Sequence, residues 1–361
     1  MQPTRHHLAF QSAVNLSFLQ PGSVDLVVTS PPYPMIEMWD DVFSAQSRDV
    51  QTALENGRGQ DAFEYMHLLL DRVWNTCYAL LRPGGFACIN VGDATRTVSG
   101  TFKLYANHAR VTSACEAIGF HSLPIIHWRK QTNAPNKFMG SGMLPSGAYV
   151  TLEHEYILIL RKGDKRIFES SDKNRRRESA FFWEERNRWF SDMWDLKGAK
   201  QRITESASRT RSGAFPFELA YRLIHMYSLQ DDLVLDPFAG TGTTVAAAIG
   251  AGRNSVGIDI DPDFLPQILN TVKTAALFLN QRVTERLKRH KAFVADGKTT
   301  RQRPFAHHNH HHNCAVVTGQ ERELQLHYVD TISYNREFDF TATYRPVGEE
   351  EDERPPILSG F

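Results

Sequence analysis

Residues 234–244, VLDPFAGTGTT, decide the fold of this 361-residue chain. An apolar strand runs into a turn of small residues, and an alanine-rich helix begins at Thr243. Gly240 and Gly242 allow the backbone to approach a ligand closely, at positions where a Cβ atom would collide with it. Because α/β sheets bind ligands at the carboxyl ends of parallel strands, the stretch predicts a ligand-binding loop on a parallel sheet.

The residues around this loop indicate which kind of ligand it holds. A dinucleotide fingerprint would have a third glycine at position 245, where Val245 stands, and a phosphate-binding P-loop would contain a lysine. A nicotinamide dehydrogenase is therefore disfavoured. Asp259 follows the next predicted strand, at the spacing of an acid that accepts hydrogen bonds from ribose hydroxyls. The loop and the acid together predict a ribonucleoside cofactor.

A second loop with chemical potential, TSPPY at residues 29–33, follows the apolar run at residues 24–28. The prolines leave the carbonyl of Pro31 without a helical partner, so it can accept a hydrogen bond from a ligand. Ser30 offers a second acceptor beside it, and Tyr33 offers a flat face for stacking of a base. Two acceptors that hold both hydrogens of an exocyclic amine can direct its lone pair at a methylsulfonium. The loop predicts methyl transfer to an amino nitrogen, a reaction that requires no metal.

Strands and helices alternate over most of the chain, which predicts a parallel sheet covered by helices on both faces. The expected strands are residues 8–10, 24–28, 86–91, 123–128, 155–160, 233–235 and 255–258. The expected helices are residues 62–81, 110–118, 217–227 and 243–249, followed by one long amphipathic helix with an apolar face from Phe264 to Leu287.

Two parts of the chain depart from this pattern. Residues 163–213 are poor in apolar residues, and their basic and aromatic side chains suit contact with phosphates and bases, although a solvated charged loop is the alternative. Residues 307–312 are rich in histidine and are expected to be a flexible linker rather than a metal site. A small β-rich extension and an acidic, disordered tail should follow. The expected nucleic-acid contacts are Lys130, Arg175, Arg176, Arg177, Arg186 and Arg188.

The composition gives weak constraints on partners and compartment. The 41 Lys and Arg residues balance the 41 Asp and Glu residues, so the net charge does not attract a polyanion. The four cysteines are scattered, which is typical of reduced core thiols. No apolar run has the length of a membrane span and no signal peptide is evident, so we expect a soluble, cytoplasmic protein without a membrane partner.

Taken together, these motifs resemble those of the DNA amino-methyltransferases, the N4-cytosine/N6-adenine family of restriction–modification systems. Residues 30–33, SPPY, fit the serine form of the family's catalytic motif, which is commoner in cytosine-N4 enzymes. Residues 236–242 fit the cofactor motif, and Asp259 fits the ribose-binding acid. Residues 213–219, GAFPFEL, resemble the segment that helps to enclose the methionine part of the cofactor. The match runs from about residue 5 to residue 290.

The resemblance implies a Rossmann-like class I methyltransferase fold of the α/β class, with a mostly parallel seven-stranded sheet and helices on both faces. The catalytic loop precedes the cofactor loop, which is similar to the circularly permuted β order. Residues 24–28 and 233–235 should then be adjacent central strands. The expected methyltransferase domain spans residues 1–291, with a catalytic half at 1–162, a variable recognition insert at 163–213 and a cofactor half at 214–291, and residues 292–361 form the extension.

The implied activity is S-adenosylmethionine-dependent methylation of an exocyclic amino group of a base that has been flipped out of the helix. Cytosine N4 in DNA is favoured, while N6-adenine methylation, methylation of RNA, and a nucleic-acid-binding protein without turnover stay open. A cognate restriction endonuclease is a suggested partner, and the oligomeric state is open. The implied catalytic residues are Ser30, Pro31, Pro32 and Tyr33. The implied cofactor-binding residues are Asp236, Pro237, Phe238, Gly240, Gly242, Thr243, Thr244, Asp259, Phe215, Pro216 and Gln11, the last standing where the family often has aspartate.

Overall fold

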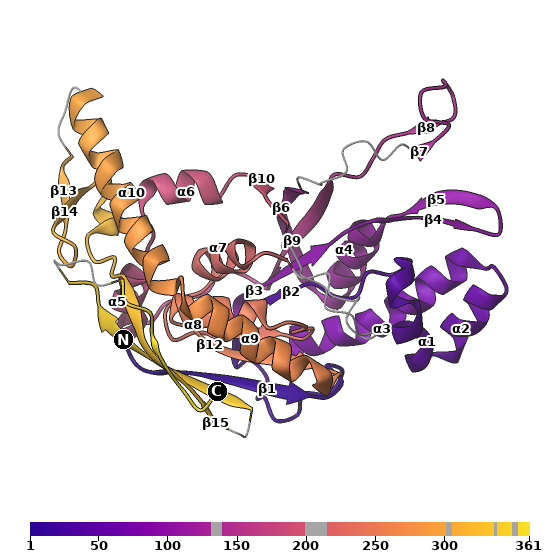
Figure 1. The fold of residues 1–361 in the computed structure, drawn as a ribbon, viewed down its shortest axis with the longest axis horizontal. Coiled ribbons are helices and arrows are strands. Elements are labelled where there is room, and N and C mark those ends of the chain that lie inside the picture. The colour runs from indigo at the N-terminus through magenta and orange to yellow at the C-terminus, as the bar shows by residue number, and fades with distance from the viewer. Residues whose placement is uncertain (131–138, 199–214, 301–304, 336–337, 349–352) are drawn as a thin grey trace.

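The chain folds around one large sheet, shown in the computed structural model in Figure 1. The structure describes residues 1–130, 139–198, 215–300, 305–335, 338–348 and 353–361. Eleven of the described strands form this sheet in the order β10-β6-β9-β3-β2-β11-β12-β1-β16-β15-β17. Its central strands are β1 (Thr4–Phe10), β2 (Val24–Thr29), β3 (Leu81–Val91), β6 (Phe120–Lys130), β9 (His154–Lys162), β11 (Leu233–Asp236) and β12 (Asn254–Asp259).

These seven central strands confirm the predicted class I methyltransferase sheet. Neighbouring strands are parallel except for β9, which runs antiparallel to both β3 and β6. The predicted adjacency of the two central strands is also confirmed, because Val234 and Leu235 of β11 pair with Leu26 and Val27 of β2. Both functional loops therefore leave the sheet from neighbouring strands at the same edge.

The sheet is larger than the predicted seven strands because both of its edges are extended. The strand β10 (Met193–Leu196) pairs with β6, and β16 (Asp339–Pro346) pairs with β1. Beyond β16 lie β15 (His327–Asn335) and β17 (Ile357–Ser359). An edge strand presents unpaired backbone groups, which these additional strands satisfy. The expected β-rich extension is thus part of the main sheet.

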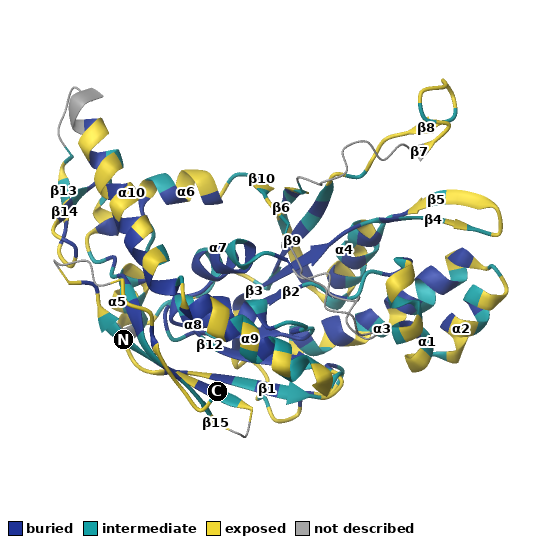
Figure 2. Ribbon diagram, viewed as in Figure 1, coloured by how far each residue is buried: buried dark blue, intermediate teal, exposed yellow. Residues whose placement is uncertain are grey.

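Helices cover both faces of the sheet, as predicted. On one face, α3 (Gly59–Leu80) and α4 (Asn107–Ile118) share a core with Val27 of β2. On the other face, α7 (Phe217–Tyr227) and α8 (Thr243–Ala251) share a core with Leu26 and Val28. Successive side chains of a strand point to opposite faces, so a strand buried on both sides is a continuous apolar run. Most residues of the central strands β2, β11 and β12 are accordingly buried (Figure 2).

The long helix predicted from Phe264 to Leu287 is instead two helices, α9 (Leu265–Ala276) and α10 (Leu279–Thr300). The amides of Leu277 and Phe278 bond to carbonyls only three residues back, which tightens and ends the last turn of α9. The helices pack on different cores, α9 beside α8 and β15, and the Val283 and Leu287 part of α10 against the C-terminal strands. A straight helix cannot reach both surfaces, so the prediction of a single helix was wrong.

The histidine-rich segment is ordered, and the prediction of a flexible linker was wrong. His307–Asn309 forms β13, which pairs with β14 (Cys314–Val316). The side chain of buried Asn309 donates to the carbonyls of Glu321 and Leu324 and accepts from the amides of His311 and His312. These buried hydrogen bonds fix the turn, which composition alone does not reveal.

The remaining elements are short. They are η1 (Glu37–Trp39), α1 (Asp40–Gln46), α2 (Arg48–Glu55), β4 (Ala94–Val98), β5 (Thr101–Tyr105), β7 (Met139–Gly140), β8 (Ala148–Tyr149), α5 (Ser170–Glu178), α6 (Trp183–Trp189), η2 (Pro262–Phe264) and η3 (Gly319–Glu321). The acidic run 349–352, the end of the predicted insert at 199–213, and residue 214 lie outside the described residues. None of the helices in the described part of the chain is long and apolar enough to span a membrane. All four cysteines are buried free thiols, as predicted.

Candidate active site

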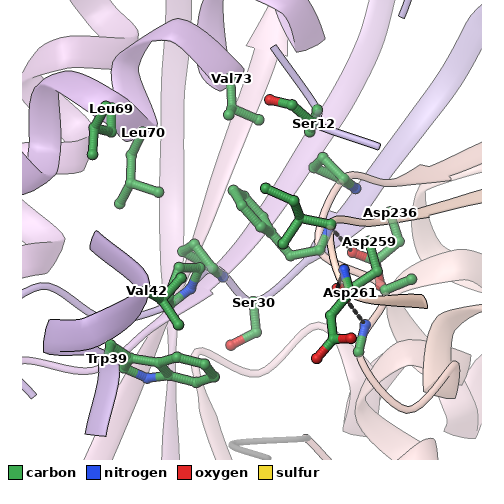
Figure 3. Close-up of a pocket in the computed structure, with 18 of the residues that line it drawn as sticks. Ser12, Ser30, Trp39, Val42, Leu69, Leu70, Val73, Asp236, Asp259 and Asp261 are labelled. Carbon is green, nitrogen blue, oxygen red and sulfur yellow. Dashed lines mark hydrogen bonds between the residues drawn. The ribbon is translucent and has the colours of Figure 1, made fainter. Parts of the chain in front are cut away.

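A cavity of about 560 Å³ opens at the carboxyl ends of the central strands. Both predicted loops line it, together with the residues that follow β1 and β12. In Figure 3, Ser30 lies between apolar side chains that include Trp39 and Val42 and acidic ones that include Asp259 and Asp261. The predicted site residues on its wall are Gln11, Ser30, Pro31, Pro32, Tyr33, Phe215, Asp236, Pro237, Phe238, Gly240, Thr243 and Asp259.

Three predicted cofactor residues stand behind this wall. A Cβ atom on Gly242, whose φ is +80°, would lie 2.7 Å from a methyl carbon of Ile268. The hydroxyl of Thr244 donates to the carbonyl of Val28 over 3.3 Å, and Pro216 is the residue before α7. Gly242 and Thr244 thus hold the cofactor loop against its neighbours.

Asp236 joins the two loops. One of its carboxylate oxygens accepts from the hydroxyl of Thr29 over 2.6 Å and from the amide of Phe238 over 3.1 Å. Burial raises the pKa of Asp236 to about 6, and the hydrogen bonds from hydroxyl groups oppose the shift. An acid this deeply buried and bonded to both loops acts first as a structural anchor.

The cofactor loop leaves room where a ligand needs it. A Cβ atom on Gly240 would meet no atom closer than 3.9 Å, so open space adjoins the backbone there. The amide of Gly240 donates to Asp259 over 2.8 Å, and the amide of Asp261 donates to the other oxygen of Asp259 over 3.0 Å. Burial raises the pKa of Asp259. A fixed carboxylate beside an open glycine turn fits a ribonucleoside.

The hydroxyl of Tyr33 is the centre of a buried hydrogen-bond network. It donates to a carboxylate oxygen of Glu155 over 2.9 Å and accepts from the side-chain amide of Asn90 over 2.7 Å. It also lies 2.9 Å from Ser30 Oγ. Burial, and then the charge of Glu155, raise the pKa of Tyr33 well above its ordinary value. The phenol therefore stays protonated, and its single hydrogen is directed at Glu155.

This arrangement determines the orientation of the Ser30 hydroxyl. Because Tyr33 gives its hydrogen to Glu155, the contact between Ser30 and Tyr33 must use the hydrogen of Ser30. The Asn90 amide lies 3.5 Å from Ser30 Oγ, a long contact, and the remaining lone-pair capacity of this oxygen can serve a ligand in the cavity. The chain of donors leaves Ser30 Oγ able to accept a further hydrogen bond.

Both Glu155 and Asn90 form hydrogen bonds with the Tyr33 hydroxyl, which makes them candidate site residues that the sequence did not reveal. Asn90 lies near the carboxyl end of β3, beside β2, so its position in a strand next to the catalytic loop was a usable signal. Glu155 is the second residue of β9, and it reaches the same edge only because β9 is antiparallel to its neighbours. Lys130, expected to contact nucleic acid, forms an ion pair with Glu155, and its ammonium lies 4.6 Å from the Trp128 ring centre.

The cavity also has an apolar wall that the sequence did not reveal. Trp39 and Val42 come from η1 and α1, directly after the catalytic loop, while Leu69, Leu70 and Val73 come from α3 (Figure 3). In the sequence these side chains have the spacing of ordinary core residues. Only their position opposite the cofactor loop marks them as ligand-facing.

None of the predicted nucleic-acid contacts lines the cavity, and Lys130 is linked to it only through Glu155 and Tyr33. Arg175 on α5 lies 3.4 Å from Asp232, which precedes β11 and is thus at the opposite end of that strand from Asp236. Arg176 and Arg177 lie on the same helix, and the Arg176 guanidinium stands over the ring of Phe168. The other two, Arg186 and Arg188, lie on α6 and are exposed.

Comparisons with known proteins agree with this geometry. The family model described as DNA methylase, N6_N4_Mtase, matches residues 24–270. The Type II methyltransferase M.MthZI of Methanothermobacter thermautotrophicus is 43% identical over 357 residues, covering 98% of this chain and 99% of that protein. The Type II methyltransferase M.MjaI of Methanocaldococcus jannaschii is 47% identical over 276 residues, covering 73% and 90%. A solved structure of a candidate DNA modification methylase from Thermus thermophilus, complexed with S-adenosyl-L-methionine, has a TM-score of 0.58 and 31% identity, covering 75% and 94%.

Proposed function

Because this chain belongs to the N6/N4 DNA methylase family, we propose that it methylates the N4 amino group of cytosine in DNA. The methyl donor of the family is S-adenosylmethionine. The observation that carries the proposal is the chain of donors from Ser30 through Tyr33 to Glu155, which leaves the Ser30 oxygen as an acceptor on the cavity wall.

The residues of the cavity fit S-adenosylmethionine. The open turn at Gly240 admits the ligand close to the backbone, and the fixed carboxylate of Asp259 can accept from ribose hydroxyls. Phe215, from the segment before α7, lies on the same wall and suits the methionine part. When bound, S-adenosylmethionine supplies an electrophilic methyl group on a positively charged sulfur.

The catalytic loop positions the amino nitrogen. Ser30 Oγ and the carbonyl of Pro31 accept one hydrogen each, which draws the lone pair of the nitrogen out of conjugation with the base. After transfer the nitrogen has a proton to lose. Ser30 accepts it and passes its own hydrogen to Tyr33, which passes its hydrogen to Glu155. Glu155 gains one proton, and Ser30 and Tyr33 return to their initial protonation states.

The target base must leave the double helix to reach Ser30, because a stacked base keeps its amino group inside the duplex. The ring of Tyr33 lines the cavity and offers a face for the flipped base. The ring sits close to Gly92, where a Cβ atom would lie 3.0 Å from it and would displace it by a few tenths of an ångström.

The choice of cytosine over adenine rests on the serine at position 30, by resemblance to the serine form of the motif. The test is incubation of the protein with S-adenosylmethionine and duplex DNA, followed by mass spectrometry of the nucleosides. We expect N4-methylcytosine, and Ser30→Ala should lose most of the product while keeping cofactor affinity. N6-methyladenine would overturn the cytosine assignment alone, and product only on RNA would overturn the DNA assignment.

We also propose that the modification protects DNA from a cognate restriction endonuclease, by analogy with the restriction–modification systems of the family. Sites methylated by this protein should resist one endonuclease that cleaves the unmethylated sequence. Cleavage of fully methylated DNA by every endonuclease of that specificity would contradict this role.

A further inference from the structure

Five arginines gather where α6, α7 and α10 meet. They are Arg188 on α6, Arg222 on α7, and Arg282, Arg286 and Arg289 on α10. We call them the arginine cluster. In Figure 1, α6 lies next to α10, and the Arg286–Glu185 ion pair joins the two helices.

Nearby carboxylates neutralise only part of the positive charge of the arginine cluster. Glu185 binds Arg286 through two nitrogens, over 2.7 and 2.9 Å. Glu218 accepts from Arg222 over 2.6 Å and also pairs with Arg282. Glu285 is a third, exposed carboxylate whose charge reaches Arg282.

Arg188 and Arg289 have no such partner. Both side chains are exposed, and no carboxylate of the described residues lies within the 4.0 Å of an ion pair with either of them. Five guanidinium groups against three carboxylates leave two positive charges in excess, and these two residues carry them. The excess faces solvent, where an anion can reach it.

Aromatic rings hold the inner members of the cluster in place. The Arg286 guanidinium lies 5.3 Å from the ring centre of Trp189, and that of Arg222 lies 5.1 Å from the ring centre of Trp194. Cation–π contacts of this kind fix a guanidinium without neutralising it. The positive charges of Arg222 and Arg286 below the surface are therefore held in fixed positions.

The arginines also repel one another. Partial burial and then the charges of neighbouring arginines lower the pKa of Arg188, and burial followed by the charge of Arg289 lowers the pKa of Arg222 to about 10. Crowded like charges are unfavourable until a counter-charge arrives. A bound anion would relieve this repulsion.

We propose that Arg188 and Arg289 bind backbone phosphates of the DNA substrate. The proposal rests on the proposed function, which supplies DNA as the polyanion. Guanidinium groups match phosphate oxygens in geometry, and a pair of uncompensated arginines on two different helices can contact two phosphates. Contacts of this kind orient the duplex and carry no base specificity.

The test compares Arg188→Gln/Arg289→Gln with the wild type in binding of one DNA duplex between about 50 and 200 mM NaCl. Each lost phosphate contact lowers the slope of log K against log salt by about 1, so the double variant should lose about 2. The matched control, Arg5→Gln/Lys288→Gln, also removes two positive charges, one on β1 and one in the Lys288–Glu353 ion pair. It should keep the wild-type slope. Arg188→Lys/Arg289→Lys should restore most of the slope.

Thermal unfolding separates this role from a structural one. Because Arg188 and Arg289 are crowded by like charges, the Gln double variant should have an unchanged or higher Tm. An unchanged salt slope in the folded double variant, or an equal fall of slope in the control, would overturn the phosphate site. If the wild type methylates the duplex in that case, the proposed function stands. A wild type that neither binds nor methylates DNA would overturn both.

Discussion

The hydroxyl of Thr29 donates to a carboxylate oxygen of Asp236 across 2.6 Å, between the last residues of two adjacent parallel strands. The catalytic loop begins at the next residue after Thr29, and the cofactor loop begins at Asp236 itself. One buried hydrogen bond thus fixes the position of the catalytic loop, which would hold the target base, relative to the cofactor loop, which would hold the methyl donor. Methyl transfer depends on such alignment, because an error of about 1 Å costs roughly 100-fold in rate.

The free energy of unfolding should depend on pH through the buried carboxyl group of Asp236. Burial raises the pKa of Asp236 to about 6 from 3.8. Between these pH values the folded protein holds a proton that the unfolded chain has released, so the free energy of unfolding falls as pH rises through this window and stays lower above it. Asp236→Asn is neutral at every pH and should abolish this loss, which amounts to about 3 kcal/mol. Urea unfolding of both proteins at pH 4 and pH 7 measures it, and an identical pH dependence would contradict the assignment.

The two loop glycines should respond differently to alanine. Gly242→Ala places a Cβ atom 2.7 Å from Ile268 at a φ of +80° and should destabilise the fold. Gly163→Ala, at a φ of +64° with nothing nearby, is the control for backbone strain alone, about 1–2 kcal/mol. Gly240→Ala, at a φ of +49° with no atom closer than 3.9 Å, should cost the same backbone strain as Gly163→Ala and should in addition weaken cofactor binding. Thermal unfolding and calorimetry with S-adenosylmethionine distinguish the three, and equal Tm losses at Gly242 and Gly163 would refute the packing argument.

Substitution of Asp259 should weaken binding of the cofactor more than binding of the target base. Asp259→Ala should weaken S-adenosylmethionine binding by about 1–3 kcal/mol, the cost of leaving ribose hydroxyls unpaired. Asp263→Ala removes an exposed carboxylate that does not line the cavity and serves as the control. Isothermal titration calorimetry measures both, and unchanged affinity in Asp259→Ala would remove this residue from the site.

Two variants distinguish the role of the Tyr33 ring from the role of its hydroxyl. Tyr33→Phe keeps the ring but deletes the bonds to Ser30 and Glu155, so kcat should fall while DNA affinity is kept. Tyr33→Ala should additionally weaken DNA binding by about 1–3 kcal/mol through lost stacking. Both should bind S-adenosylmethionine normally. Steady-state kinetics and DNA titration test this, and equal DNA affinity in the two variants would argue against stacking.

Glu155 should affect turnover through Tyr33. Glu155→Gln keeps the shape of the side chain but removes the proton acceptor, so kcat should fall about 100-fold with little change in the KM for DNA. Glu153→Gln changes an exposed carboxylate two residues earlier and should behave as wild type. A wild-type kcat in Glu155→Gln would show that the proton leaves by another route.

Local patterns were sufficient for much of the fold. The apolar runs at residues 24–28 and 233–235 are strands because a strand buried on both faces has no polar alternation. The turns at Gly240 and Pro31 are visible in the sequence because these residue types have distinctive backbone freedom. The apolar periodicity from Phe264 to Leu287 is continuous, but its two halves pack on different cores. The sequence therefore did not reveal the break between α9 and α10.

The sequence by itself determined the two loops, their order and the strands that carry them, since these depend on residues within a few positions of each other. Only the tertiary structure decided that Glu155 stands behind Tyr33 and that Arg188 and Arg289 share one surface. Glu155 reaches the catalytic edge because β9 reverses direction, and the arginines meet because three helices converge. Strand direction and helix convergence are set by long-range pairing and packing, and no local periodicity encodes them.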